Sequence, residues 1–126
     1  MTPLPTTRYE VCVSDAIPER GRMIVDVGEK TVGIFRVDGQ LYAYENTCAH
    51  QGGPVCQGAI IPRVRERLDQ AQATLGFAFD ETQMHIVCPW HGFEYRITTG
   101  RHPAKADIAL LPIHVTEQNG FVYVAL

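Results

Sequence analysis

Hydrophobic and polar residues alternate with a period of two along most of the chain. Near the N-terminus, Tyr9, Val11 and Val13 alternate with Glu10, Cys12 and Ser14, which is typical of a half-buried strand. The same pattern predicts further strands at Met23–Val27, Thr31–Val37, Gln40–Glu45, Met84–Val87, Phe93–Ile97, Leu110–Glu117 and Phe121–Leu126. Many short strands separated by turn residues are typical of a small antiparallel sandwich or barrel, so the predicted fold class is all-β.

Two dipeptides predict tight hairpins. Asp38-Gly39 lies between the predicted strands Thr31–Val37 and Gln40–Glu45. Asn119-Gly120 lies between the last two predicted strands. Asp-Gly and Asn-Gly favour two-residue turns because both positions of such a turn need a positive φ.

One segment departs from this rhythm. Val64, Leu68, Ala71 and Leu75 have helical spacing, and Pro62 suits a first helical turn. We therefore expect a short helix from Pro62 to about residue 73, inserted into a β protein.

Length and composition narrow the function classes. A chain of 126 residues has room for one domain, so residues 1–126 are expected to form a single unit. A net charge of −3 argues against nucleic acid as a partner. No apolar stretch approaches the roughly 20 residues that cross a bilayer, and the first residues carry no secretory signal. A cytoplasmic protein without a membrane partner is expected.

The chemistry is concentrated in two short clusters of cysteine and histidine. Cys48-Ala49-His50 and Cys88-Pro89-Trp90-His91 each follow a predicted strand, and glycines follow each of them. Each cluster offers one thiolate and one imidazole, and the glycines let the backbone turn tightly around a common centre. The two clusters therefore predict a metal site built from two loops.

The pattern C-x-H…C-x-x-H is similar to that of the Rieske [2Fe–2S] proteins. The resemblance extends over about residues 8–126 and implies a small antiparallel sandwich with a cluster-binding subdomain at about residues 46–107. Carried over by position, it implies that Cys48 and Cys88 hold one iron and that His50 and His91 hold the other, with one [2Fe–2S] cluster per chain. A third loop around Pro103 resembles the proline-containing loop that covers the cluster in the family.

Two cysteines and two histidines can also hold a zinc ion, which leaves a non-redox metal-binding module as an alternative. Zinc fingers usually pair like ligands, whereas each loop of this chain mixes the two types. The mixed loops favour the two-iron cluster over zinc.

The resemblance also indicates which residues surround the cluster. High-potential members join their loops by a disulfide at the positions that Gly53 and Trp90 occupy, so no such bridge can form. After the second histidine those members offer a serine and a tyrosine hydroxyl. This chain has Phe93 and Tyr95 there, which predicts a potential in the lower part of the family range of about −150 to +300 mV.

The other cysteines and histidines are expected to be structural. Cys12 and Cys56 are interpreted as unpaired thiols in a reducing compartment. His85 and His114 lie in predicted strands, which favours structural or solvent-facing roles. His102 lies beside the proline loop but is not assigned as a ligand.

The stretch between the two ligand loops is longer than compact family members need. The surplus forms an insertion at about residues 57–82, which carries Arg63, Arg65 and Arg67. It is interpreted as a solvated surface excursion rather than as a docking appendage, because charged faces are usually only solvent-exposed.

The resemblance implies a soluble one-electron carrier. Such a protein takes electrons from an NAD(P)H-dependent flavoprotein reductase and passes them to a terminal oxygenase, and the chain is not expected to be the oxygenase itself, which adds a domain with a mononuclear iron. Two alternatives remain open. One is a small subunit of a multisubunit oxidoreductase such as a nitrite-reductase-like enzyme, and the other is the non-redox metal module.

Overall fold

The computed structural model describes residues 7–47, 52–68, 74–89, 92–105 and 107–126, and only the backbone of 62–68 and 74–82. The described residues form two antiparallel sheets, which confirms the all-β prediction. The elements are β1 (Arg8–Val13), η1 (Ser14–Ala16), β2 (Arg22–Val27), β3 (Lys30–Val37), β4 (Gln40–Glu45), η2 (Val55–Gln57), β5 (Ala59–Leu68), β6 (Thr74–Val87), β7 (Glu94–Arg96), β8 (Pro112–Gln118) and β9 (Phe121–Ala125).

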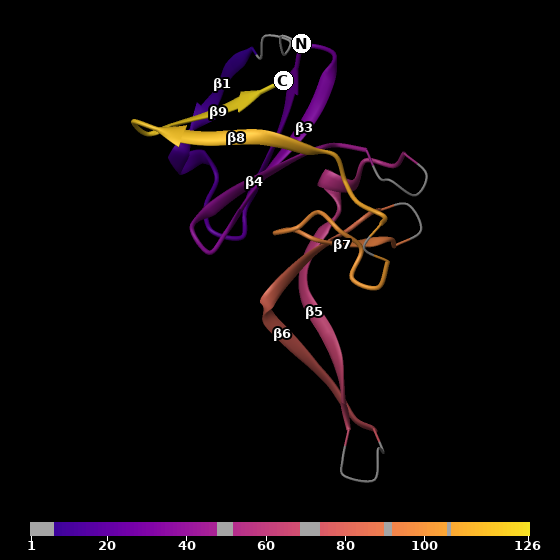
Figure 1. Cartoon of the computed structure of the whole chain (residues 1–126). Coiled ribbons are helices and arrows are strands. Elements are labelled where there is room, and N and C mark those ends of the chain that lie inside the picture. The colour runs from indigo at the N-terminus through magenta and orange to yellow at the C-terminus, as the bar shows by residue number, and fades with distance from the viewer. Residues whose placement is uncertain (1–6, 48–51, 69–73, 90–91, 106) are drawn as a thin grey trace.

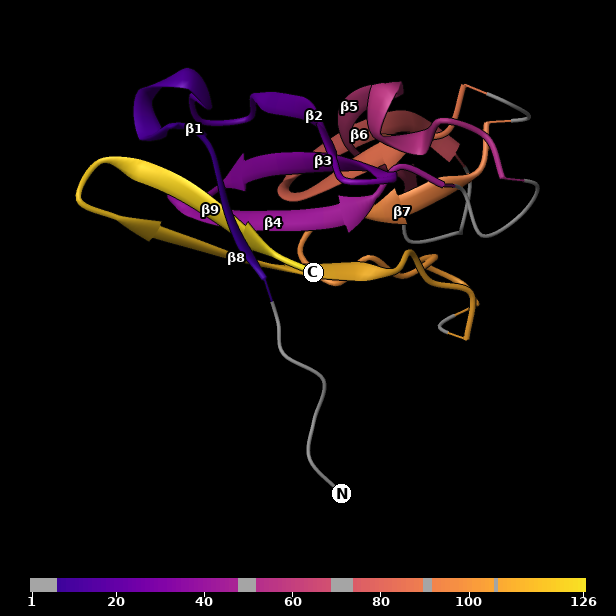
Figure 2. The same cartoon turned by 90° about the horizontal axis from the view of Figure 1, so that it is seen from above.

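The larger sheet has six strands in the order β1-β9-β8-β4-β3-β2. Its two halves are joined where Ala43 and Tyr44 of β4 pair with Ile113 and Pro112 of β8. Seen from above, β8 and β9 run alongside β3 and β4 (Figure 2). The first hydrophobic core fills the space between the halves and is built from Ile17, Val27, Val32, Ile34, Ala43, Val122 and Val124.

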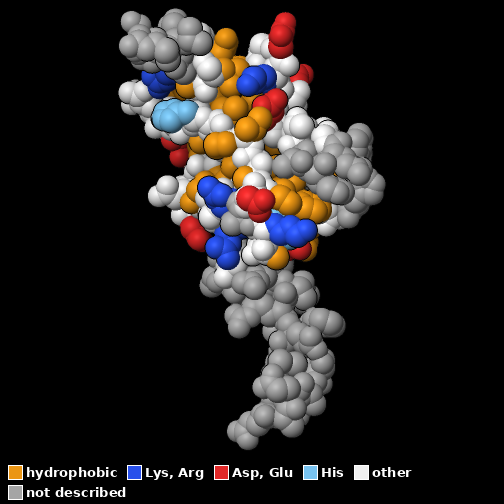
Figure 3. All heavy atoms as spheres, turned by 45° about the vertical axis from the view of Figure 1, so that its right-hand side comes forward, with side chains coloured by type: hydrophobic (Ala, Val, Ile, Leu, Met, Phe, Trp, Pro, Cys, Tyr) orange, Lys and Arg blue, Asp and Glu red, His pale blue; other side chains and the backbone are white. Residues whose placement is uncertain are grey.

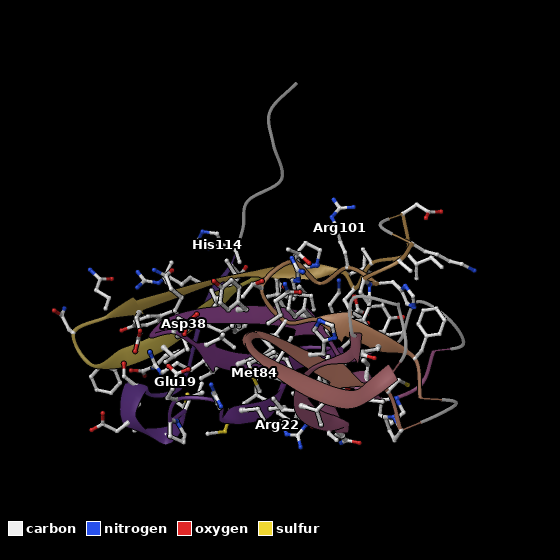
Figure 4. All side chains as sticks on the ribbon, turned by 90° about the horizontal axis from the view of Figure 1, so that it is seen from below. Glu19, Arg22, Asp38, Met84, Arg101 and His114 are labelled. Carbon is white, nitrogen blue, oxygen red and sulfur yellow. The ribbon has the colours of Figure 1, made fainter. Side chains whose placement is uncertain are left out.

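Both predicted hairpin turns are confirmed. Asp38 and Gly39 have φ values of 52° and 77°, and Asn119 and Gly120 have 53° and 81°, as a two-residue turn requires. The Glu19 carboxylate accepts hydrogen bonds of 2.8 Å from the amides of both Asp38 and Gly39 (Figure 4). These two donors, with Gly39 the larger contribution, lower the pKa of Glu19.

The N-terminal strand exists as predicted, but its buried residues differ from the simple alternation. The register of β1 against β9 shifts between Glu10 and Cys12, which is a β-bulge. As a result Tyr9 and Val13 are 37% and 50% exposed, whereas Val11 and Cys12 pack against the first core. The extra residue turns successive side chains toward the same side, which a strict period of two does not anticipate.

The smaller sheet has three strands in the order β5-β6-β7. A second core lies between this sheet and the other face of β3, and it is built from Phe35, Val37, Tyr44, Val55, Cys56, Met84, Ile86, Cys88, Tyr95, Ile97 and Leu110. Strand β3 therefore has both faces buried, since Val32 and Ile34 belong to the first core while Phe35 and Val37 belong to the second.

The predicted helix from Pro62 to about residue 73 is wrong. Positions 59–68 and 74–87 form β5 and β6, a long antiparallel hairpin whose far part extends away from the rest of the molecule (Figure 1). The pairs Val64↔Phe79 and Glu66↔Phe77 stand opposite each other in its register. The segment also alternates with a period of two, and an isolated helix of about 12 residues is marginal in water, so cross-strand pairing prevails. The tip at residues 69–73 lies outside the described residues.

Candidate metal centre

The end of the first predicted ligand loop and the start of the second lie side by side at one end of the smaller sheet, where β5 begins and β6 ends. The first loop joins β4 to β5, and the second joins β6 to β7. Ala59 at the start of β5 pairs with Val87 at the end of β6. At Gly58 the backbones are so close that a Cβ atom would lie 1.7 Å from the carbonyl oxygen of Val87. The described flanks of both loops lie on the same side of the molecule, at the right of both ribbon views (Figures 1 and 2).

Polar contacts hold the part of the first loop that leads into β5. The Asn46 side-chain carbonyl accepts a 2.8 Å hydrogen bond from the amide of Cys56, which closes the base of the loop. The Arg22 guanidinium, which reaches from β2, donates to the carbonyl oxygens of Cys56, at 2.9 Å, and of Gly58 (Figure 4). On β3 only glycine fits at position 33, because a Cβ there would lie 2.5 Å from the Cys56 sulfur. The loop is thus tied to two strands of the larger sheet.

The second loop is closed by its own backbone. The amide of Cys88 donates a 2.7 Å hydrogen bond to the carbonyl of Phe93. Gly92 between them has a φ of 66°, a conformation that glycine adopts without strain. Cys88 itself is 1% exposed and belongs to the second core. A predicted thiolate ligand therefore lies at the root of the loop, shielded from water.

The segment around Pro103 lies next to the end of the second loop. The rings of Phe93 and His102 are 4.6 Å apart. The Nδ1 atom of His102 accepts hydrogen bonds of 3.1 Å from the amides of Ala104 and Lys105, so His102 shapes the turn that carries the exposed Pro103. His102 is therefore a structural part of the third loop.

Two tyrosines support the loops from the second core. Tyr95 is fully buried, and its ring lies 5.6 Å from that of Phe93. The Tyr44 hydroxyl donates a 2.6 Å hydrogen bond to the carbonyl of Ile97, which anchors the start of the third loop. Burial, with smaller contributions from Tyr42 and Cys56, raises the pKa of Tyr44.

Several predicted site residues are not among those that the structure describes. Cys48, His50, Trp90 and His91 lie outside the described residues, whereas Gly53 is buried in the described part of the first loop. Within the described ranges, no group of three or more His, Cys, Asp or Glu residues could hold a metal ion. The observations that fit a group bound between the loops are the pairing of Ala59 with Val87 where the first loop ends and the second begins, the left-handed glycine of the second loop and the buried thiol of Cys88.

The structure describes the remaining cysteines and two further histidines outside the ligand loops. Cys12 and Cys56 are free thiols, and burial raises the pKa of Cys56 to about 12. His114 is exposed on β8, whereas His85 is 1% exposed and contacts Glu94. Sequence reasoning missed the contact between His85 and Glu94 and the role of Arg22. An arginine or a glutamate in a strand gives no signal of which distant partner it meets.

The family model of the Rieske [2Fe–2S] domain matches residues 7–112. The chain belongs to the Rieske family. Each chain of this Rieske protein carries one [2Fe–2S] cluster.

Known proteins agree with this membership. Ferredoxin CarAc of Metapseudomonas resinovorans is 28% identical over 92% of this chain and 91% of its own length. A Rieske domain-containing protein of Homo sapiens is 31% identical over 92% of this chain and 74% of its own length. Among solved structures, a putative NADH-dependent nitrite reductase small subunit from Mycobacterium tuberculosis superimposes with a TM-score of 0.70 at 14% identity, covering 97% of this chain and 96% of that one.

The last of these matches shows the shared fold alone, because its sequence identity is low. The Rieske ferredoxins among the relatives are electron carriers rather than catalytic enzymes. In the described part of the chain, no helix has the length and apolar character needed to cross a membrane.

Proposed function

We propose that this protein is a one-electron carrier that accepts electrons from an NAD(P)H-dependent flavoprotein reductase and delivers them to a terminal oxygenase. The observation that supports the proposal is the close approach of the described flanks of the two ligand loops, where Gly58 lies against the Val87 carbonyl. A bound group there lies near the surface, so a partner can approach it closely. The similarity to a ferredoxin of nearly the same length supports the same function.

We assign the cluster ligands from the sequence pattern. Cys48 and Cys88 hold one iron, and His50 and His91 hold the other. When bound, the cluster supplies one-electron chemistry at this end of the fold. The burial of Cys88 supports its role, because a buried sulfur keeps water away from the sulfur-ligated side.

The surrounding side chains tune the site. Phe93 offers no hydroxyl to a sulfur atom, whereas the fully buried Tyr95 retains one. A hydrogen bond to sulfur stabilises the more negative reduced state, so the loss of one donor lowers the midpoint potential. We therefore expect a midpoint potential in the lower part of the family range.

The cluster assignment is tested by iron and sulfide analysis together with low-temperature EPR of the dithionite-reduced protein. We expect two irons and two sulfides per chain and the EPR signal of a mixed-ligand cluster. The Cys88→Ala variant should lose both, whereas Cys12→Ala, which removes a free thiol on β1, should retain them. A colourless wild-type protein that contains zinc would overturn the assignment in favour of the metal module.

The partner assignment is tested by reconstitution. A shuttle exchanges freely between a reductase and an oxygenase, so it should support turnover when supplied in trans and should purify alone. Stable co-purification with a larger oxidoreductase would instead favour the subunit role, the alternative that a nitrite reductase small subunit of the same fold keeps open. In Figure 3 both signs of charge are scattered among hydrophobic side chains on the face shown, which suits a transient contact.

A cytoplasmic location is part of the same proposal. The free thiols of Cys12 and Cys56 are compatible with a reducing compartment. Cell fractionation with antibody detection tests this location.

A further inference from the structure

The far part of the β5–β6 hairpin stands apart from the rest of the described structure (Figure 1). We call it the arm, and it comprises residues 63–68 of β5 and 74–80 of β6. A register shift between Pro62 and Arg63 separates the arm from the root of the hairpin. In the described part of the chain, β7 pairs with β6 at residues 85–87, so no third strand continues alongside the arm. A two-stranded hairpin is marginally stable in water by itself, which indicates that something else supports the arm.

The register sorts the residues of the arm onto two faces of different character. Residues opposite each other in an antiparallel pair share a face, and successive residues of one strand alternate between the faces. One face, which we call the apolar face, therefore carries Val64, Glu66, Leu68, Phe77 and Phe79. Glu66 is the one charged residue of these five. The other face, which we call the basic face, carries Arg63, Arg65, Arg67, Gly76, Ala78 and Asp80.

The apolar face has the size of a stable interface once two copies of it are combined. A phenylalanine buries about 150–250 Å² when it is covered completely. Two arms stacked face to face combine Phe77 and Phe79 from each copy, together with Val64 and Leu68. The area that these residues can bury reaches about 1,000 Å², which is the size that a specific protein–protein interface needs.

The chemistry of this face favours a second copy of the chain over a redox partner. Contacts between electron-transfer proteins are small and transient, whereas the interfaces of permanent homodimers are larger and more apolar. A carrier leaves its redox partner after each transfer, so a face reserved for that partner would be uncovered in between, and large uncovered apolar patches are rare on monomers. A second copy covers the face permanently. A twofold axis stacks the apolar face on itself and leaves the two basic faces on the outside, so like charges are not brought together.

We propose that two copies of this chain associate by stacking the apolar faces of their arms. The pairing gives each two-stranded arm the second layer that a small sheet needs for stability. In Figure 1 the arm extends to the bottom of the view, whereas the described flanks of the ligand loops lie at the right, above it. The paired arms therefore leave the ligand-loop side accessible to redox partners. The insertion then has a role beyond the solvated excursion that its charges alone suggest.

Sedimentation velocity of the cluster-loaded protein over a range of concentrations tests the pairing. We expect the wild type to sediment with the mass of two chains and to dissociate on dilution. Phe77→Ser and Phe79→Ser change the apolar face, and each should weaken the association by about 100-fold, because apolar burial is lost from both copies. Ala78→Ser is the matched control, because it introduces the same residue between these two positions but on the basic face. It should associate as the wild type does.

A wild type that stays monomeric at every concentration overturns the proposal, and so does a dimer that Phe77→Ser and Phe79→Ser leave unchanged. If neither variant folds, hydrogen exchange of the wild type decides. The amides of residues 63–68 and 76–80 should exchange more slowly at concentrations where the dimer forms, and a rate that does not depend on concentration overturns the pairing. Slow exchange that requires an added flavoprotein reductase assigns the apolar face to that partner and also overturns it. Sedimentation does not depend on the cluster, so a missing EPR signal counts against the proposed function alone.

Discussion

The contact between the two ligand loops can be tested by adding one methyl group. Gly58 has φ and ψ of −76° and 175°, which any residue can adopt, so nothing in its backbone conformation requires glycine. Only space requires it. In Gly58→Ala the new Cβ would lie 1.7 Å from the Val87 carbonyl oxygen and 2.7 Å from its carbon. Because the obstructing atoms are backbone, β5 and β6 must separate by about 1.3 Å to restore a contact of 3.0 Å.

The magnitude follows from that displacement. Overpacking a well-packed site costs about 1–3 kcal/mol, and a backbone obstacle belongs at the upper end, so we expect a loss of about 3 kcal/mol of unfolding free energy. The Ala59↔Val87 pair, which aligns the loops, is the first to be disturbed. We therefore also expect a lower iron content per chain. Without the obstacle, a glycine-to-alanine change at this φ would instead stabilise the protein by about 0.4–1 kcal/mol.

The assay is urea unfolding followed by circular dichroism, with iron analysis of the same samples. Gly28→Ala is the matched control, because Gly28 has the opposite character: its φ is 62°, yet nothing lies within 4 Å of the added Cβ. The Gly28→Ala variant should lose about 1 kcal/mol of unfolding free energy through backbone strain and keep its iron. If Gly58→Ala unfolds at the wild-type urea concentration or above and keeps a full complement of iron, the argument that the loops touch at this position is refuted.

Four further predictions concern single side chains. Tyr44→Phe leaves a buried carbonyl without its donor, so it should cost about 1–3 kcal/mol in urea unfolding. Glu117→Gln tests the ion pair with Arg36, whose hydrogen bond lowers the pKa of Glu117. The folded-state value lies below the unfolded one, so the pair stabilises the protein above about pH 4.5. The stability difference between variant and wild type, about 0.5 kcal/mol near pH 7, should disappear in acid. Cys56, with its pKa raised to about 12, should resist iodoacetamide at pH 8 until the protein is unfolded, and rapid labelling of the folded protein would contradict its burial. Tyr95→Phe should lower the midpoint potential in a redox titration, and an unchanged value would contradict the hydrogen bond to sulfur.

The elements that the sequence predicted correctly are those whose signals are local. Asp38-Gly39 and Asn119-Gly120 dictate their turns through backbone conformations that these residues tolerate, and the turns set the register of the flanking strands. The second ligand loop lies between two strands, Met84–Val87 and Phe93–Ile97, that the alternation predicts in the same local way. Local chemistry is therefore sufficient for most of this fold.

The wrong predictions concern segments whose conformation depends on residues far away in the sequence. Residues 62–73 satisfy both a helical and an alternating pattern, and only the pairing of positions such as Val64 and Phe79 selects the strand. The bulge in β1 likewise depends on how this strand meets β9. At the metal centre, the anchoring of the first loop by Arg22 could not be predicted, because the acceptors are backbone carbonyls that carry no sequence signal.

The double burial of β3 has a consequence for the whole molecule. Val32 and Ile34 on one side and Phe35 and Val37 on the other make this strand a member of both cores. Neither core can open without exposing β3. The amide protons of β3 should therefore exchange with deuterated solvent only through global unfolding, and their exchange should be among the slowest in the protein. We therefore expect damage near the ligand loops to destabilise the hairpins at the other side as well, and the chain to unfold as one cooperative unit.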